Sequence, residues 1–267
     1  MKKTLLTLGI LTVLFYSCEK IEKESTQVTR DHLLAEQTFN HVGRVIEDGF
    51  IDNSISKNCP SYTLINTNTT DQDTMIIDYG NGIPDECISY GNKKRGKIIV
   101  IYTGKYRDSL SVMTANFDDY RVNNNLIQGE RIVTNQGRDS VSKNMCFSVE
   151  VKNASIGTNN GTIDWNANRT REWVSGSATY YDISDDQYKI TGSANGIGVN
   201  NNSFTMEITE ALNVDLGCLP SCVIKSGKAK ITPNGYTERT INYGDGICDC
   251  NFDVTINGTT YPIVIEN

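Results

Sequence analysis

The sequence is poor in histidine, and this scarcity limits the chemistry it can offer. His32 and His41 are its two histidines, and they stand nine residues apart within one predicted helix. A zinc site needs several grouped ligands, and a serine nucleophile needs an imidazole with its own orienting partner. The spacing indicates neither, so we interpret both histidines as structural or surface residues and expect no cofactor.

The chain also lacks an excess of basic residues. It has 25 Lys and Arg against 32 Asp and Glu, a net charge of −7; without Lys2 and Lys3, 23 basic residues remain and the balance is −9. Nucleic acids and anionic membrane surfaces attract basic proteins. The balance argues against either as the main partner, and the acidic surplus favours solubility.

Long apolar runs are missing everywhere except in the first eighteen residues, MKKTLLTLGILTVLFYSC. Lys2 and Lys3 form a positive start, and residues 5–16 are apolar but too short to span a bilayer comfortably. Ser17 is the small residue that signal cleavage needs, and Cys18 follows it. These features are typical of an export signal.

This pattern resembles the signal of bacterial lipoproteins, with residues 15–18 as the lipobox. The resemblance implies a signal peptide at residues 1–17, a palmitate-bearing lipid on Cys18 and a flexible tether over residues 18–30. It places the protein in the cell envelope, anchored to the outer membrane by that lipid. The alternative is an ordinary signal peptide that is cleaved nearby.

Seven cysteines follow Cys18: Cys59, Cys87, Cys146, Cys218, Cys222, Cys248 and Cys250. They predict disulfides, because an exported chain folds in an oxidising environment. Cys59 precedes Cys87 by 28 residues, and these two should pair. Cys248 should pair with one of the two cysteines 26 and 30 residues before it, and a second bridge to the neighbouring cysteine stays open. Seven is odd, so one thiol is free, and the strand-like surroundings of Cys146 favour that residue.

The only convincing helix pattern lies in residues 31–50. Apolar residues recur there at steps of three and four, which is typical of a helix with one buried face. Asp31 is a candidate N-cap and Gly49 a candidate stop. The polar face is not basic, so we expect this short helix to lie on a sheet and not on a membrane.

From about residue 60 onward the sequence predicts strands. Residues 97–103, KIIVIYT, are apolar on both faces and should form a central strand. Residues 146–151 and 203–208 alternate strictly, which indicates one buried face. Residues 261–265 alternate too, and Pro262 places that strand at a sheet edge. Asn- and Gly-rich separators between such runs suit hairpin turns.

Internal comparison of the sequence indicates a drifted repeat of about 65 residues. Similar segments begin at Gly96, Gly161 and Gly227, at intervals of 65 and 66 residues. The predicted fold is mainly β, with antiparallel sheets built from such repeats, as a sandwich or an elongated rolled sheet, plus the N-terminal helix. We expect one domain over residues 31–267, with two sub-halves of about 31–160 and 161–267 as an open alternative.

Two acidic turns, IIDYGNGIPDEC at 76–87 and TINYGDGICDC at 240–250, resemble each other. Their carboxylates, Asp78, Asp85, Asp245 and Asp249, are weak candidates for calcium ligands. The spacing does not match the alternating ligands and distal glutamate of an EF-hand loop. We therefore interpret the turns as hairpin punctuation, in which glycine supplies a positive φ.

The strongest candidates for a binding site are aromatic and cationic. Trp165 and Trp173 flank Arg169 and Arg171, an arrangement that can stack on sugars or pair with anionic groups. Cross-strand packing is the alternative. Adjacent acids, such as the pair 185–186, should point apart into solvent, so we assign no catalytic residues.

The lipobox together with residues 79–82, 96–107, 169–173 and 243–248 resembles a group of exported Bacteroidota lipoproteins of uncharacterised function. The resemblance implies an all-β exported domain and supplies no catalytic residues. We therefore expect an envelope-anchored, non-catalytic binding or structural module for a polysaccharide or another envelope protein, of open oligomeric state. The alternative is a secreted glycoside hydrolase whose acidic residues are brought together by the fold.

Overall fold

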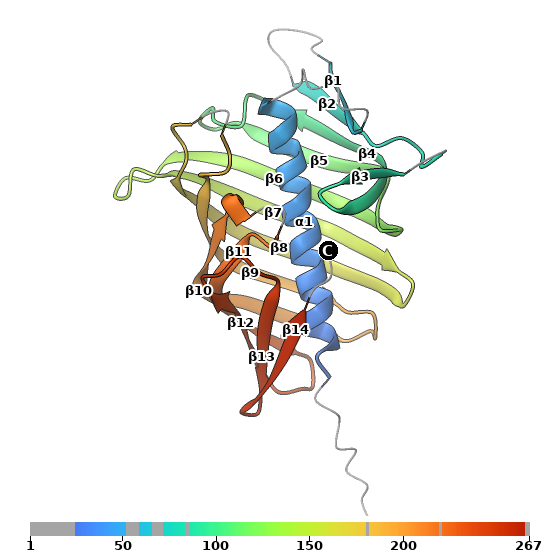
Figure 1. The fold of residues 1–267 in the computed structure, drawn as a ribbon, viewed down its shortest axis with the longest axis vertical. Coiled ribbons are helices and arrows are strands. Elements are labelled where there is room, and N and C mark those ends of the chain that lie inside the picture. Colours follow the sequence, from blue (N-terminus) through green and yellow to red (C-terminus); the bar gives the residue numbers. More distant parts are fainter. Residues whose placement is uncertain are drawn as a thin grey trace, which may run out of the picture.

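The computed structural model describes residues 25–51, 59–65, 72–83, 86–179, 182–218 and 221–264, and it places one long helix against one face of a curved sheet (Figure 1). The helix is α1 (Gln27–Ile51). The strands are β1 (Ser61–Ile65), β2 (Asp73–Asp78), β3 (Cys87–Ser89), β4 (Asn92–Tyr102), β5 (Val112–Val122), β6 (Asn125–Arg138), β7 (Met145–Thr158), β8 (Gly161–Ser175), β9 (Gln187–Ile197), β10 (Ser203–Asp215), β11 (Ile224–Pro233), β12 (Arg239–Asp245), β13 (Asn251–Ile256) and β14 (Thr259–Val264), with a 3-10 turn η1 (Leu216–Cys218) after β10.

The strands form a single open antiparallel sheet in which nearly every strand pairs with its neighbour in sequence. The order runs from β1 and β2 through β4 to β14, and β3 pairs only with β4. The prediction of a mainly β, antiparallel fold with one N-terminal helix is confirmed. Of the two architectures left open, one curved sheet is found. Pro262 lies in the edge strand β14, opposite Asp253 of β13, as predicted.

The helix is longer than its sequence pattern predicted. It begins at Gln27, whose N–H donates to Ser25 Oγ at 3.2 Å, so the last residues of the expected tether are helical. Asp31 is therefore not the N-cap. Its Oδ2 accepts the backbone N–H of Val199 at 3.0 Å and ties the helix to the loop after β9. Gly49 lies inside α1, where a Cβ would lie 2.6 Å from Met75 Sδ, so it permits close contact with the sheet. The proposed signal peptide and Cys18 lie outside the described residues.

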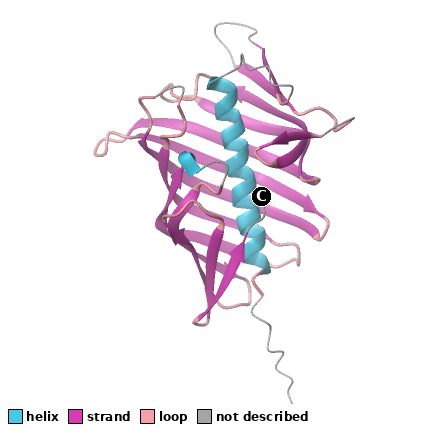
Figure 2. Ribbon diagram, viewed as in Figure 1, coloured by secondary structure: helices cyan, strands magenta, loops and turns pink. Residues whose placement is uncertain are grey.

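The sheet wraps around α1 and buries it on most of its circumference. Figure 2 shows the helix lying along the concave side of the sheet, with strands of both ends of the sheet turned toward it. Buried side chains of the helix, such as Phe39, Val42 and Ile46, share one hydrophobic core with the inward-facing residues of the strands. Within the described part of the chain, no helix combines the length and apolar character that crossing a membrane requires. The helix is thus a core element, as predicted for a helix lying on a sheet.

The Asn-rich separators form the expected tight hairpins. Asn123 and Asn124, between β5 and β6, have φ of 47° and 69°, and Asn257 and Gly258, between β13 and β14, have φ of 49° and 79°. Two consecutive residues with positive φ make the turn whose twist matches antiparallel strands. The turn chemistry of the sequence therefore fixes the register of neighbouring strands.

The curvature of the sheet comes from irregularities within the strands. In β6, Gly129 has a φ of 106° and stands where the pairing with β7 shifts by one residue. A Cβ there would lie 2.5 Å from Ala154 Cα and 2.7 Å from the carbonyl oxygen of Asn153. Bulges of this kind bend a strand and increase its twist. Gly129 thus allows β6 and β7 to bend around the helix.

The repeat boundaries expected from the sequence have unlike positions in the fold. Gly96 and Gly227 lie inside β4 and β11, each at a shift of pairing register, whereas Gly161 begins β8 after a hairpin. The hairpin ladder from β7 to β8 also crosses the expected division between residues 160 and 161. The two expected sub-halves therefore share one sheet and one core.

Replacing Gly129 by alanine should destabilise the protein more than replacing a glycine of an open turn. Gly129→Ala combines a strained φ with an overlap against the β7 backbone, and we expect it to cost about 3 kcal/mol of unfolding free energy. Gly258→Ala is the matched control, because its φ is 79° and nothing lies within 4 Å, and it should cost about 1 kcal/mol. Urea denaturation measures both, and equal losses would contradict the proposed bend.

Candidate functional site

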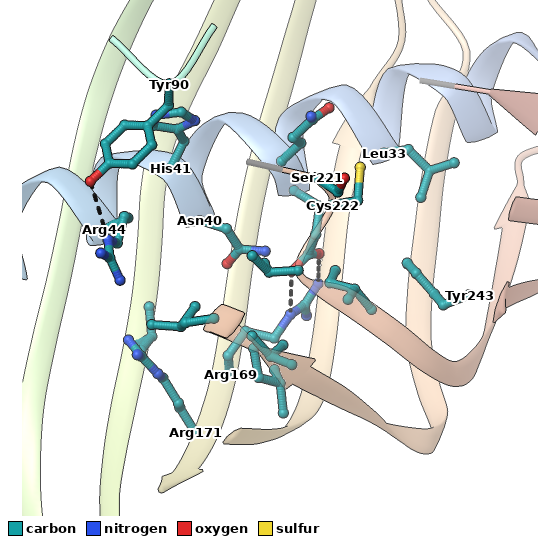
Figure 3. A pocket seen from close by; sticks show the side chains of 18 of the residues that line it. Leu33, Asn40, His41, Arg44, Tyr90, Arg169, Arg171, Ser221, Cys222 and Tyr243 are labelled. Carbon is teal, nitrogen blue, oxygen red and sulfur yellow. Dashed lines mark hydrogen bonds and ion pairs between the residues drawn. The ribbon is translucent and has the colours of Figure 1, made fainter. Parts of the chain in front are cut away.

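A cavity of about 140 Å³ lies between one face of α1 and the sheet (Figure 3). The helix residues that line it recur at steps of three and four, so they share one face. They are Leu33, Glu36, Gln37, Asn40, His41, Arg44 and Glu47. All but the first are polar. The cavity is therefore bordered on its helix side by a stripe of hydrogen-bonding and charged groups.

Strand β8 directs two arginines at this helix face. Arg169 and Arg171 are two residues apart, so both point to the same side of the sheet. Arg169 Nη2 lies 2.5 Å from Glu36 Oε2, and its Nε lies 3.4 Å from Oε1. Arg171 Nη1 lies 2.5 Å from Glu47 Oε1, and its Nη2 lies 3.3 Å from Oε2. Two bidentate ion pairs thus join the sheet to the helix.

Both glutamates are held in their charged form. Burial alone would raise the pKa of Glu36. The charge and hydrogen bonds of Arg169, together with the other neighbouring groups, outweigh burial and lower this pKa. Burial opposes ionisation of Glu47 too, and Arg171 likewise brings the pKa of that carboxyl below its ordinary value. Arg171 is fixed further by Tyr106, whose hydroxyl lies 3.0 Å from Nη1, and by the ring of Tyr188, whose centroid lies 3.5 Å from Cζ. The cavity wall is therefore preorganised and ionic.

Breaking one of these pairs should be costly, whereas removing both partners should cost less. Glu36→Gln leaves the Arg169 guanidinium buried without its counter-charge, so we expect a loss of about 3–5 kcal/mol of unfolding free energy. The double variant Glu36→Leu with Arg169→Met should be more stable than the single variant.

The matched control for this comparison is the exposed pair of Glu210 and Lys228, whose charged atoms lie 2.7 Å apart. Glu210→Gln should remain within about 1 kcal/mol of the unaltered protein. Urea denaturation of the four proteins supplies the comparison. A Glu36→Gln variant as stable as Glu210→Gln would contradict the assignment of a buried ion pair.

The two tryptophans of the predicted site lie in the core beside the cavity. Trp165 and Trp173 are 2% and 3% exposed. Trp165 Nε1–H donates to His32 Nδ1 at 3.2 Å, and the Trp165 ring stacks on Phe39. Trp173 Nε1–H donates to Asp186 Oδ1 at 3.0 Å. The structure thus brings the arginines to the cavity and surrounds the tryptophans with protein.

Asp186 departs from its prediction as a solvated turn residue. It is 2% exposed, and burial, aided by the negative charge of Glu47, raises its pKa to about 6. The prediction was wrong because Asp186, just before β9, accepts a hydrogen bond from the buried indole of Trp173, whose partner in the pairing of β8 with β9 is Tyr188. Its neighbour Asp185 accepts a hydrogen bond from Thr179 Oγ1 at 2.6 Å on the surface.

A second polar cluster lies around the middle of α1. Lys94 Nζ, from β4, lies 2.9 Å from His41 Nε2. Burial lowers the pKa of both groups, to about 7 for Lys94 and about 3 for His41, where the Lys94 charge adds to the effect. Arg44 Nε lies 3.1 Å from Asp48 Oδ1, and Asp48 accepts a short hydrogen bond from Tyr90. Of the two histidines, His32 lies in the core and His41 lines the cavity beside Lys94.

Sequence reasoning missed Lys94 and Arg131, because charged residues in a strand ordinarily face solvent. The available signal was alternation: Arg131 stands on the same side of β6 as the buried Ile127 and Val133. Gly43 was a further signal within the helix. A Cβ on Gly43 would lie 2.8 Å from Arg131 Cζ, so the glycine leaves room for that guanidinium.

The predicted disulfides are confirmed. Cys59 pairs with Cys87, and the open pairing of the other four resolves into Cys218–Cys248 and Cys222–Cys250, with Cα atoms 5.7, 5.2 and 5.2 Å apart. Cys146 is the free cysteine among the described residues and is partly buried, as expected. Cys222 also lines the cavity, so its bridge fixes the loop before β11 as part of the cavity wall.

The carboxylates of the two acidic turns serve the local structure. Asp78 accepts the Gly80 N–H at 2.8 Å and pairs with Lys97, and Asp249 accepts the Asn251 N–H at 3.1 Å. Asp245 stands opposite Ser226 in the sheet, and Asp85 lies outside the described residues. Across the described ranges, no group of three or more His, Cys, Asp or Glu could hold a metal ion.

His32 should make the stability of the protein depend on pH. Burial lowers its pKa from 6.5 to about 4. Below pH 6.5 the unfolded chain takes up a proton that the folded state refuses until about pH 4, so stability is full above pH 6.5 and falls through this window. The total loss for His32 should be about 3 kcal/mol.

This effect can be isolated with His32→Gln, whose amide oxygen can still accept the Trp165 N–H. The unfolding free energies of the unaltered protein and the variant, measured by urea denaturation, should converge as the pH falls from 6.5 to 4. Apart from Glu36, whose pKa the charge of His32 also affects, the other titrating groups are common to both proteins and cancel in the difference. Parallel profiles across the window would contradict the buried neutral state of His32.

Comparisons of the chain with protein-family models, with curated proteins and with solved structures find no match. The site must therefore be interpreted from its own geometry and chemistry.

Proposed function

We propose that this chain is a lipid-anchored, non-catalytic binding module of the cell envelope, and that the cavity beneath α1 is its binding site. The anchor is the lipid expected on Cys18, at the outer membrane. The observation that carries the proposal is the cavity itself: a mostly apolar space with a small number of fixed polar groups is the usual form of a ligand site. Charged groups converge on it from both α1 and β8.

The walls of the cavity favour binding by a preformed site. The helix face is held by two ion pairs to β8, and the loop that contains Ser221 and Cys222 is held by a disulfide to Cys250. A site whose side chains are already ordered loses little conformational entropy when a ligand enters. Rigid walls of this kind therefore support affinity without a large rearrangement of the protein.

Ionisation of the cavity carboxylates favours binding over glycoside hydrolysis. A glycoside hydrolase needs one protonated carboxyl group that donates to the leaving oxygen and a second carboxylate across the sugar. Glu36 and Glu47 are the carboxylates that line the cavity, and their arginine partners lower both pKa values. Neither is suited to give up a proton at neutral pH.

The size of the cavity restricts how an envelope component would bind. A volume of about 140 Å³ is similar to the roughly 150 Å³ of an engineered cavity that binds benzene. A polysaccharide or an envelope protein would therefore insert an end group or a side group, and the rest of the partner would remain outside.

Binding can be tested on an array of envelope glycan fragments with the full chain in a soluble Cys18→Ser form. Ser221 is an exposed residue of the cavity-lining loop. Ser221→Trp should obstruct the cavity and weaken binding at least tenfold. Ser140→Trp, at an exposed turn between β6 and β7, is the matched control and should bind like its parent.

Binding unchanged in Ser221→Trp would exclude the cavity as the site, and release of shortened sugars would support the hydrolase alternative.

The lipid anchor is tested separately, by producing the unaltered chain in the presence of an alkyne analogue of palmitate. The label should be incorporated into the chain that retains Cys18 and should be missing from Cys18→Ser. A labelled Cys18→Ser chain would contradict lipidation at that cysteine.

A further inference from the structure

Arg131 is the one arginine of the cavity wall that lies without a partner among the described residues. It projects from β6, is 6% exposed, and packs over the helix backbone at Gly43. None of its N–H groups donates a hydrogen bond within the described part of the chain, and no carboxylate there lies within ion-pair distance. Arg169, Arg171 and Arg44 each have a carboxylate of α1 beside them.

A buried guanidinium without partners is unfavourable in a folded protein. It carries five N–H donors, and leaving charged donors unsatisfied costs free energy that a ligand would recover. Burial lowers the pKa of Arg131 to about 10, so the group remains charged at neutral pH.

Part of the cavity lining that the sheet contributes is apolar. Val149, Ile190, Val214, Ile224 and Phe252 line it, from strands β7, β9, β10, β11 and β13. A fully hydrated inorganic ion gains nothing from such surfaces, whereas an apolar group loses contact with water when it covers them. The cavity therefore combines an uncompensated positive charge with room for a hydrocarbon body.

We propose that the cavity binds a small organic carboxylate, whose head group pairs with Arg131 and whose apolar body contacts the apolar side chains of the β-sheet. The proposal rests on the proposed function in that it uses the same cavity. A guanidinium matches the planar geometry of a carboxylate with two parallel hydrogen bonds. The Glu47 charge also acts on Arg131, but Glu47 is ion-paired with Arg171, so a bound carboxylate supplies Arg131 with a counter-charge of its own. The carboxylate is either a free organic acid or the acidic end group of a larger envelope component.

The test is isothermal titration of the full-length Cys18→Ser protein with benzoate and with its uncharged isostere benzamide. Benzoate should bind at least tenfold more tightly than benzamide, because only its carboxylate can pair with Arg131. Acetate and inorganic phosphate, which carry negative charge without the apolar body, should also bind at least tenfold more weakly than benzoate. A methyl ester of benzoate, lacking the charge, should behave as benzamide does.

Arg131→Met keeps an unbranched side chain of similar volume and removes the charged guanidinium, and it should weaken benzoate binding at least tenfold. It should unfold at the same temperature as the parent or higher, because an unpaired buried charge is replaced by an apolar group of similar volume. Arg138→Met is the matched control, since Arg138 lies in the same strand and is exposed. It should bind benzoate like the parent.

Benzamide binding as tightly as benzoate overturns the proposal, and so does unchanged benzoate binding in a folded Arg131→Met variant. If Arg131→Met does not fold, two other measurements decide the question. One compares benzoate with benzamide on the parent protein, and the other measures benzoate binding to Arg131→Lys, which retains the charge. Binding of a neutral glycan that Ser221→Trp abolishes and Arg131→Met leaves unchanged would overturn this proposal and leave the proposed function standing. Tight binding of an acidic glycan terminus, with weak binding of free benzoate, would identify the end group as the source of the carboxylate.

Discussion

The structure depends on the two buried ion pairs between α1 and β8. A helix largely surrounded by a sheet has little solvent-facing surface on which to place its charged residues, and α1 carries glutamates on the side that faces the sheet. Burial of a lone carboxylate is prohibitively costly, so each needs a cation at hydrogen-bonding distance. Arg169 and Arg171 meet this need because they lie between the two buried tryptophans on the same side of one strand. The pairs orient the helix in the sheet and at the same time place charges along a cavity.

Curvature of the sheet is the second condition, because a flat sheet would cover only one side of the helix. The bends occur inside strands, where shifts of register coincide with residues of positive φ such as Gly129 in β6 and Asn153 in β7. These positions carry no chemistry, and their effect on the site is indirect. They bring strands from opposite parts of the sheet, such as β4 and β13, to the same helix. The cavity is the space that remains where the bent sheet and the polar helix face do not meet.

The sequence predicted the strands and turns, which depend on patterns of neighbouring residues. It missed the contacts that depend on the curvature of the whole sheet. Strict alternation and Asn-Gly turns identify strands and hairpins because each feature acts within a few residues. The interval of 28 residues identified Cys59–Cys87, whereas the pairing of the four later cysteines stayed open in the sequence. Arg169 and Arg171 were recognised as site candidates, yet their partners Glu36 and Glu47 stand 133 and 124 residues away. Nothing local links such residues. The same limit explains why the burial of Arg131 was missed. Its position in the strand pattern indicates a buried residue, but its charge is typical of a residue that faces solvent.

The difference between Arg131 and its neighbours has a source in the helix sequence. Glu36, Gly43 and Glu47 lie seven and four residues apart, a spacing that places all three on one helix face. The two glutamates stand against arginines of β8, whereas the residue against Arg131 is a glycine. A glycine supplies no counter-charge and leaves the guanidinium against the helix backbone beside the cavity. The chain thus repeats one arrangement along α1 and omits the acid at a single position. An unpaired buried charge lowers stability, and residues of binding sites commonly retain such unfavourable arrangements because the ligand completes them. This is the physical reason for regarding Arg131, and not the two ion-paired arginines, as the group that selects the ligand.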